Sequence, residues 1–169
     1  AQIAYPKAHK DNTVDVYFGE KVADPYRWLE DDMSAQTAEW VDAENAVTRK
    51  YLDNIPMRKN ILKRLKETAN YEKIGIPFKR QGKWYVYRNN GLQNQSVLYQ
   101  MDSPTADASK QRVWLDPNTL STDGTVALKG IYFSHNGRYM AYVISRSGSD
   151  WEEIYVKDCQ TGRDIDDHI

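Results

Sequence analysis

The chain has 169 residues, enough for one domain of ordinary size, and a globular composition with 40% hydrophobic and 28% charged residues. A net charge of -1 gives no reason to expect a nucleic-acid partner, whose binders carry a clustered basic surface. No apolar run is long enough to span a bilayer, so no membrane partner is expected. The single cysteine, Cys159, excludes an internal disulfide framework and a thiolate metal cluster.

The segment from about residue 24 to 70 carries a helical pattern. Asp24 before Pro25 predicts an N-cap followed by proline at the first position of a short helix. Ser34 predicts the cap of a longer helix, and Pro56 the restart of the chain into a third. The apolar residues expected to face inward recur at helical spacing: Trp40, Ala43, Val47 and Tyr51, then Ile61, Leu62, Leu65 and Ala69. The basic side of the third helix is expected to be a solvated surface rather than a phosphate-binding face.

From Tyr71 onward the pattern changes to short β-runs separated by turn residues. The predicted strands are 74–79, 83–89, 96–102 and 111–115, followed by 129–134, 138–146, 153–158 and 162–166. Gln81-Gly82, Asn136-Gly137 and Thr161-Gly162 supply the positive backbone angles that tight hairpins require. Each group of strands is a four-stranded antiparallel meander, the blade module of a β-propeller.

An internal echo supports this division into repeated units. Residues of the first unit reappear about 55 positions later: Phe78, Gly82, Lys83, Trp84 and Tyr87 as Phe133, Gly137, Arg138, Tyr139 and Tyr142, and then Leu98, Tyr99 and Asp102 as Ile154, Tyr155 and Asp158. A period of roughly 50 residues built from aromatic strands is typical of propeller blades. Because two blades cannot close a ring, we expect the chain to be part of something larger.

Enzyme motifs are absent from the sequence. It contains no Gly-x-Ser-x-Gly, no phosphate loop, no Gly-x-Gly-x-x-Gly and no His-Glu-x-x-His. His9, His135 and His168 are scattered, and the acidic clusters at 30–32 and 164–167 have no acid–base partner. Cys159 is expected to be a packed thiol rather than a nucleophile. We therefore expect no catalytic residues, no metal site and no cofactor in this chain.

Four segments are too long and too ordered to be chance turn chemistry: DPYRWLEDD (24–32), NNGLQNQSVLYQMD (89–102), LDPNTLSTDGT (115–125) and SRSGSDWEEIYVKD (145–158). In this order and spacing, from about Tyr5 onward, they resemble the amino-terminal part of the prolyl oligopeptidase family. Relatives such as oligopeptidase B carry versions of the first segment. NNGLQNQSVLY, and DPN followed by SxDGT, are similar to the prolyl-specific branch.

The resemblance implies a two-domain serine peptidase that cleaves short peptides on the carboxyl side of proline. Its chain starts with helices that pack on an α/β-hydrolase domain, builds a seven-bladed propeller and returns to supply the catalytic serine, aspartate and histidine. Residues 1–70 would be the helical segment and 71–169 the first two blades, an α+β fragment that is inactive alone. Its partners would be the remainder of the polypeptide and short proline-containing peptides. With no signal region at Ala1-Gln2-Ile3, a cytoplasmic or periplasmic location is expected.

Two links between second and third strands, 90–95 and 147–151, should share one face of the propeller because successive strands alternate in direction. The resemblance implies that this face meets the hydrolase domain. We therefore hypothesise that Asp150 and Trp151 lie on it, with Asp150 tuning a cationic substrate-binding group. The alternative is that Gly148 and Asp150 only make a turn while Trp151 covers a blade edge.

Asn89, Gly91 and Gln93 form the corresponding motif in the first unit. For Asn89 and Gln93 we favour structural hydrogen bonding within the blade over a role in a site.

Two other functions remain open at this point. The chain could be a free-standing module whose blades bind a peptide or protein, although open blade edges would then invite pairing with other chains. It could also come from a related oligopeptidase of different specificity, such as cleavage after basic residues. For the chain in isolation we expect self-association through unpaired strands.

Overall fold

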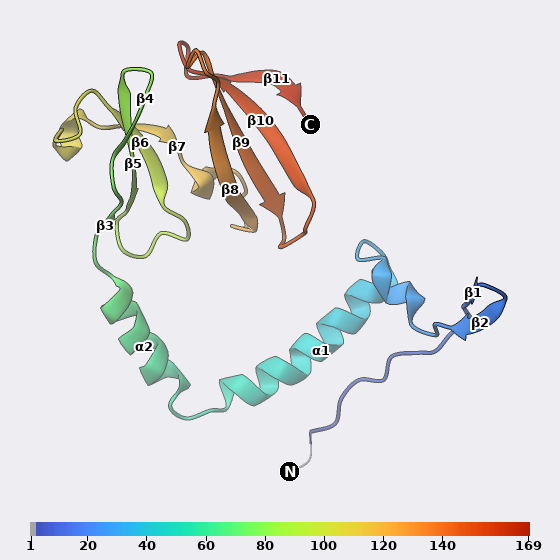
Figure 1. Ribbon diagram of the computed structural model, residues 1–169. Helices are drawn as coiled ribbons and strands as arrows, with labels where there is room; N and C mark the ends of the chain where they lie inside the picture. Colours follow the sequence, from blue (N-terminus) through green and yellow to red (C-terminus); the bar gives the residue numbers. More distant parts are fainter. Residues whose placement is uncertain (1–2) are drawn as a thin grey trace. The chain divides into compact units, whose positions relative to one another are not determined.

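Residues 3–169 are described by a computed structural model (Figure 1). The chain divides into two compact units, one ending at Arg64 and the other running from Leu65 to Ile169. The division into a helical segment of residues 1–70 and two blades in 71–169 stays a prediction.

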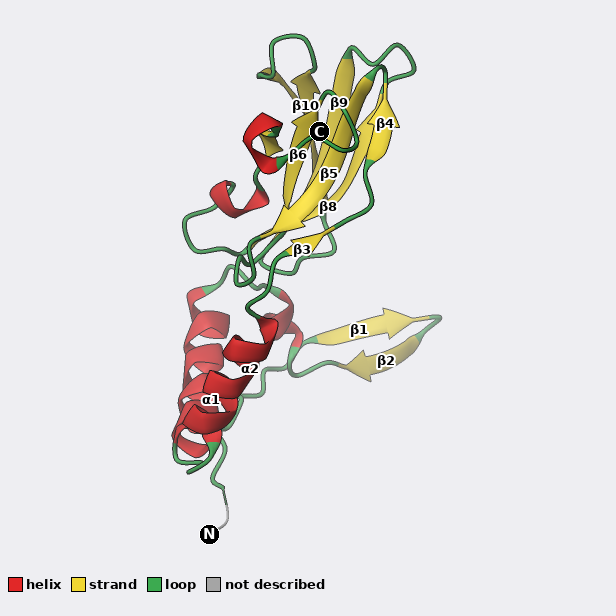
Figure 2. Cartoon of the chain, turned by 90° about the vertical axis from the view of Figure 1, so that its left-hand side faces the viewer, coloured by secondary structure: helices red, strands yellow, loops and turns green. Residues whose placement is uncertain are grey.

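The first unit begins with a β-hairpin that the sequence analysis did not predict. Strands β1 (Val14–Tyr17) and β2 (Glu20–Ala23) pair antiparallel, as Figure 2 shows. The turn between them has positive φ at both central residues, 53° at Phe18 and 88° at Gly19. Two positive φ values are typical of the tight hairpin turn whose twist matches that of the strands.

The short 3₁₀ helix η1 (Arg27–Glu30) begins later than the sequence suggested. Its N-cap position is Tyr26, which makes no side-chain cap, so the prediction of Asp24 as the cap with Pro25 at the first helical position was wrong. Asp24 instead accepts hydrogen bonds from the Tyr26 backbone N–H at 3.4 Å and from Arg27 Nε at 2.6 Å. The carboxylate thus holds a turn before the helix and pairs with a guanidinium.

Two longer helices follow, α1 (Ala35–Asp53) and α2 (Arg58–Ala69). The N-cap of α1 is confirmed as Ser34, whose side chain accepts a hydrogen bond from Thr37 N at 3.1 Å. The apolar stripe of α1 is half-buried as far as Val47. Ile61, Leu62 and Leu65 of α2, expected to face inward, are exposed in the part of the chain that the structure describes.

The first sheet contains β3 (Lys73–Ile74), β4 (Phe78–Arg80), β5 (Lys83–Asn89), β6 (Val97–Met101) and β7 (Arg112–Leu115). Both β3 and β4 pair with β5, so the predicted strand 74–79 is one outer strand in two pieces. Pro77 lies in the interruption and has no N–H to donate to the ladder. The 3₁₀ helices η2 (Ala108–Lys110) and η3 (Pro117–Thr119) flank β7.

The second sheet is an unbroken antiparallel meander of β8 (Val126–Phe133), β9 (Tyr139–Arg146), β10 (Glu152–Asp158) and β11 (Asp164–His168). The expected fold class is confirmed: helices are followed by two antiparallel meanders. The outer strand β11 is fully exposed and carries Asp164, Asp166 and Asp167.

The two sheets repeat one another in register, with one difference from the sequence echo. Phe78 pairs with Tyr85 as Phe133 pairs with Met140, which preserves the echo in the first two strands. In the third strand, Leu98 lies opposite Tyr87, whereas Tyr155 lies opposite Tyr142. The counterpart of Leu98 is therefore Tyr155 and not Ile154, because a shift of one residue reverses the face to which every side chain points.

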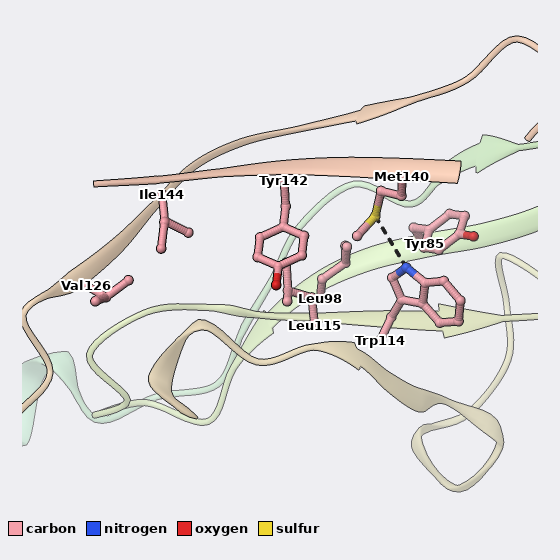
Figure 3. Close-up of a cluster of buried hydrophobic side chains, with 8 residues drawn as sticks. All are labelled: Tyr85, Leu98, Trp114, Leu115, Val126, Met140, Tyr142 and Ile144. Atoms are coloured by element: carbon pink, nitrogen blue, oxygen red, sulfur yellow. Dashed lines mark hydrogen bonds between the residues drawn. The ribbon is translucent and has the colours of Figure 1, made fainter. Parts of the chain in front are cut away.

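The core lies between the two sheets, which face each other across it (Figure 3). Its buried side chains come equally from both: Tyr85, Leu98, Trp114 and Leu115 from the first, and Val126, Met140, Tyr142 and Ile144 from the second. Trp114 Nε1 donates to Met140 Sδ at 3.3 Å across the interface. Burying each large apolar side chain contributes about 1.5–3 kcal/mol, so each sheet depends on the other for stability.

Candidate functional site

The two loops that the sequence analysis singled out lie at the same end of the two sheets (Figure 1). The connection between β7 and β8 links them. Asn94 in the first loop donates from Nδ2 to the Gly124 carbonyl at 3.1 Å, and Ser147 N in the second donates to the adjacent Thr125 carbonyl at 3.0 Å.

The first loop is held by side-chain hydrogen bonds to its own backbone. Asn89 is buried, accepts from Gly91 N at 2.9 Å and donates to the Gln93 carbonyl at 3.0 Å. Gln93 Oε1 accepts from Asn90 N at 2.9 Å. Gly91 has φ +133°, and a Cβ there would collide with Asn70. Asn89, Gly91 and Gln93 thus stabilise the fold of this loop.

A hydrogen-bonded seam joins this loop to the second sheet. Gln95 donates from Nε2 to the Val126 carbonyl at 2.7 Å and accepts at Oε1 from Leu128 N at 2.8 Å. Its own backbone N–H and carbonyl are both bonded to the Asn118 side chain at 2.9 Å. The sequence analysis did not assign a role to Gln95 or Asn118, although both lie in its quoted segments. Their role could not be predicted from the sequence, because it depends on which strands become neighbours in the fold.

The second loop presents Asp150 and Trp151 to solvent. A tight turn precedes them, with φ 52° at Ser147 and 76° at Gly148, closed by Ser149 N to the Arg146 carbonyl at 2.9 Å. Trp151 is 86% exposed, which is unusual for so large an apolar side chain, and Asp150 is also exposed. The space around Gly148 is open, so its positive φ, and not crowding, favours glycine there.

A charged cluster lies beside this loop. Arg146 Nε donates to Glu153 Oε1 at 2.7 Å, and the Tyr155 hydroxyl donates to Glu153 Oε2 at 2.7 Å. These hydrogen bonds, first from Arg146 and then from Tyr155, lower the pKa of the Glu153 carboxyl to about 2. Arg146, 7 residues earlier in the chain, thus helps to hold the Glu153 carboxylate in its charged form.

The remaining candidates for chemistry are dispersed. His9 stacks on Trp28 with ring centroids 4.3 Å apart, whereas His135 is in the β8–β9 turn and His168 ends β11. Among residues 3–169, no group of three or more His, Cys, Asp or Glu side chains is arranged to hold a metal ion. Burial, followed by the nearby Asp158, raises the pKa of the Cys159 thiol, which lowers its nucleophilicity. None of the described helices combines the length and apolar character needed to cross a membrane.

Comparison with known proteins decides the family. The model of the prolyl oligopeptidase N-terminal β-propeller domain matches residues 5–169. The chain belongs to the prolyl oligopeptidase family. A prolyl endopeptidase of Elizabethkingia miricola is 46% identical over 99% of this chain, and one of Elizabethkingia meningoseptica is 44% identical over the same share. The chain spans 23% of the length of each.

Solved structures of prolyl oligopeptidases share the fold. A prolyl endopeptidase structure matches 98% of this chain with a TM-score of 0.76 and 31% identity, and the match covers 24% of that protein. Prolyl oligopeptidase B of Galerina marginata, bound to a 35mer hydrolysis and macrocyclization substrate, matches all of this chain with a TM-score of 0.70 and 29% identity over 26% of its own length. In these prolyl oligopeptidases the matching region is part of a larger single chain.

Proposed function

We propose that the chain is the amino-terminal part of a serine-type prolyl endopeptidase that hydrolyses short peptides on the carboxyl side of proline. The observation that carries this proposal is the 46% identity to a prolyl endopeptidase over 99% of the chain. In the whole enzyme an activated serine would attack the carbonyl carbon on the proline side, with histidine as base and an oxyanion hole stabilising the intermediate.

The role of this portion would be to form part of the propeller that gates access of substrates to a hydrolase domain. The described residues contribute no catalytic triad under this proposal, so the portion alone is inactive. Two features support its association with further polypeptide. The apolar side chains of α2 are exposed, with Ile61 at 52% and Leu65 at 59%, and both sheets have unpaired edge strands.

Asp150 and Trp151 would lie on the propeller face that meets the hydrolase domain. Their exposure, at the same end of the sheets as the first loop, supports this role. The Trp151 side chain is 86% exposed, and covering its ring with another surface would remove it from water and be favourable. Asp150 would then tune a cationic substrate-binding group on the opposite surface.

The test uses the complete reading frame that contains this sequence. The purified enzyme should release a reporter placed after proline and not one placed after alanine, and a serine-reactive phosphonate should label and inactivate it. Cleavage after arginine instead would assign a different oligopeptidase specificity. Absence of both hydrolysis and labelling would favour a binding module. The 169-residue portion is the matched control, in which neither hydrolysis nor labelling is expected.

A further inference from the structure

A groove of about 300 Å³ lies where the two sheets meet, at the end opposite to loops 90–95 and 147–151. The β4–β5, β8–β9 and β10–β11 turns converge there, as Figure 1 shows at the upper end of both sheets. A hydrogen bond from the Gln81 side chain to the His135 carbonyl joins two of these turns. Its lining includes Arg80, Lys83, Arg112, Phe133, Asn136 and Cys159.

The charge of this groove is opposite to that of the chain. Its lining contains three cations, Arg80, Lys83 and Arg112, and no carboxylate, whereas the chain as a whole has a net charge of -1. Lys83 is neutralised by Asp102 at 2.5 Å. Among residues 3–169, no ion pair supplies a carboxylate to Arg80 or Arg112. Arg80 therefore has no carboxylate partner there, and Arg112, whose Nε and Nη2 donate to Gln100 Oε1, keeps its Nη1 side for an anion.

Arg112 is held in place by a buried polar network. Gln100 is 3% exposed, donates from Nε2 to the Tyr85 hydroxyl at 2.8 Å and accepts from Arg112 Nε at 2.7 Å. A buried amide stabilises the fold only when it is bonded in this way, so Gln100 fixes the guanidinium at the groove. The guanidinium also lies 5.2 Å from the Trp114 ring centroid. An ordered arginine loses less conformational entropy on binding than a free one.

Arg80 comes from β4, on the opposite side of the same sheet from β7, which carries Arg112. Its guanidinium lies 5.4 Å from the Phe78 ring centroid and donates to the Lys79 carbonyl at 2.8 Å. The sequence echo places His135 at the position about 55 residues later, so the second sheet does not repeat this charge. The ion pair of Arg138 with the buried Asp158 at 2.8 Å repeats the Lys83–Asp102 pair of the first sheet. All three cations of the groove therefore come from the first sheet, and the second sheet adds none.

We propose that this groove binds the side-chain carboxylates of an acidic peptide. Guanidinium groups bind carboxylates through paired N–H donors, and two of them at one groove favour a ligand with more than one carboxylate. The half-buried ring of Phe133 and the exposed amide of Asn136 suit a peptide more than an isolated small ion. An adjoining pocket of about 250 Å³ shares Lys83, Gln100 and Arg112, and it contains one carboxylate, Asp102, which is paired with Lys83, together with a further cation, Lys110. This proposal stands independently of the proposed peptidase activity.

The first test measures the fluorescence anisotropy of a labelled tetraglutamate peptide at low salt. Arg80→Gln and Arg112→Gln should each weaken binding about tenfold, and added salt should weaken it further. Arg80→Gln is the safer variant, because Arg80 makes no contact with the buried network. Lys129→Gln removes a charge from β8 outside the groove and should leave binding unchanged. Equal binding to wild type and both arginine variants, or equal binding of tetraglutamine, overturns the proposal.

The second test separates a peptide from a small oxyanion and locates the site. Cys159 lines the groove, so bound tetraglutamate should slow its alkylation, measured by mass spectrometry of the tryptic peptide 158–163. The protection should disappear in Arg80→Gln. Inorganic phosphate that protects Cys159 at the same concentration as tetraglutamate would contradict recognition of a peptide. Peptide binding without protection of Cys159 would contradict the assigned location.

Discussion

At the scale of single residues, the loop between β9 and β10 combines a constrained turn with free side chains. Ser147 and Gly148 hold positive φ values, whereas Trp151 projects into solvent. The carboxylate of Glu153 beside them is fixed by Arg146 and Tyr155. The backbone is therefore specified by local contacts, whereas the side chains of Asp150 and Trp151 are exposed.

Titration of Glu153 should show this fixation directly. The pKa of its carboxyl should be about 2, and Arg146→Gln should raise that pKa part of the way to the ordinary 4.5, because Tyr155 still donates. A pKa lowered by folding adds stability above the unfolded value, and this stability is lost as pH falls toward 2. Carbon-detected NMR of the side chain measures the midpoint. Arg163→Gln, at the other end of β10, should not move it, and an unshifted midpoint in Arg146→Gln contradicts the assignment.

Asp150 offers a sharper residue-scale test in the complete enzyme. If Asp150 faces a cationic group there, Asp150→Asn should lower kcat/KM about tenfold. It should also move the limb of the pH–rate profile controlled by that group to lower pH, because a cation without its carboxylate neighbour is less basic. Glu152→Gln is the matched control, since Glu152 is also exposed and adjacent. Unchanged turnover together with an unchanged pH profile would mean that Asp150 only helps to form the turn.

At the scale of elements, the sequence predicts most strands because turn residues delimit them. The strand from Lys83 to Asn89 was predicted at its observed bounds, between the Gln81-Gly82 turn and the Asn-rich loop. The break at Pro77 and the hairpin β1–β2 were missed. The break at Pro77 depends on how an outer strand crosses its neighbour. The strands of the hairpin are too short to show a strong alternation of apolar and polar residues.

The contacts of the candidate site were less accessible to sequence reasoning than the strands. The exposed loop of Asp150 follows from its turn residues. The bonds of Gln95 to β8 and of Gln100 to Arg112 do not, because they require the relative placement of strands far apart in sequence. The sequence echo also misaligned the third strands by one residue, since side-chain similarity alone does not define register.

The seam between the sheets gives a prediction at this scale. Gln95→Ala removes two hydrogen bonds to β8 and leaves the Val126 carbonyl and Leu128 N–H without their partner. We expect a loss of about 2 kcal/mol in the free energy of unfolding of the two-sheet unit. Denaturant unfolding followed by tryptophan fluorescence measures it, with Gln160→Ala, an exposed glutamine, as the control. Equal midpoints for the two variants would show that the seam contributes little.

At the scale of the whole molecule, both sheets end in edge strands that have no further strand beside them among the described residues, although the Gln95 side chain bonds the outer groups of Val126 and Leu128 in β8. Such edges pair readily with other chains. The isolated 169-residue chain should therefore self-associate, with an average mass by light scattering that rises with concentration. A sharp monomer at high concentration contradicts this prediction.

The outer strand β11 restricts which edge can take part. Two copies joined along this strand would bring Asp166 and Asp167 of one molecule against the same residues of the other. Like charges facing each other across a strand pair are destabilising. These carboxylates therefore disfavour pairing through β11, and oligomers would have to grow through β7 or the interrupted outer strand of the first sheet. Because pairing through β11 is disfavoured, we expect small oligomers to form before any extended sheet.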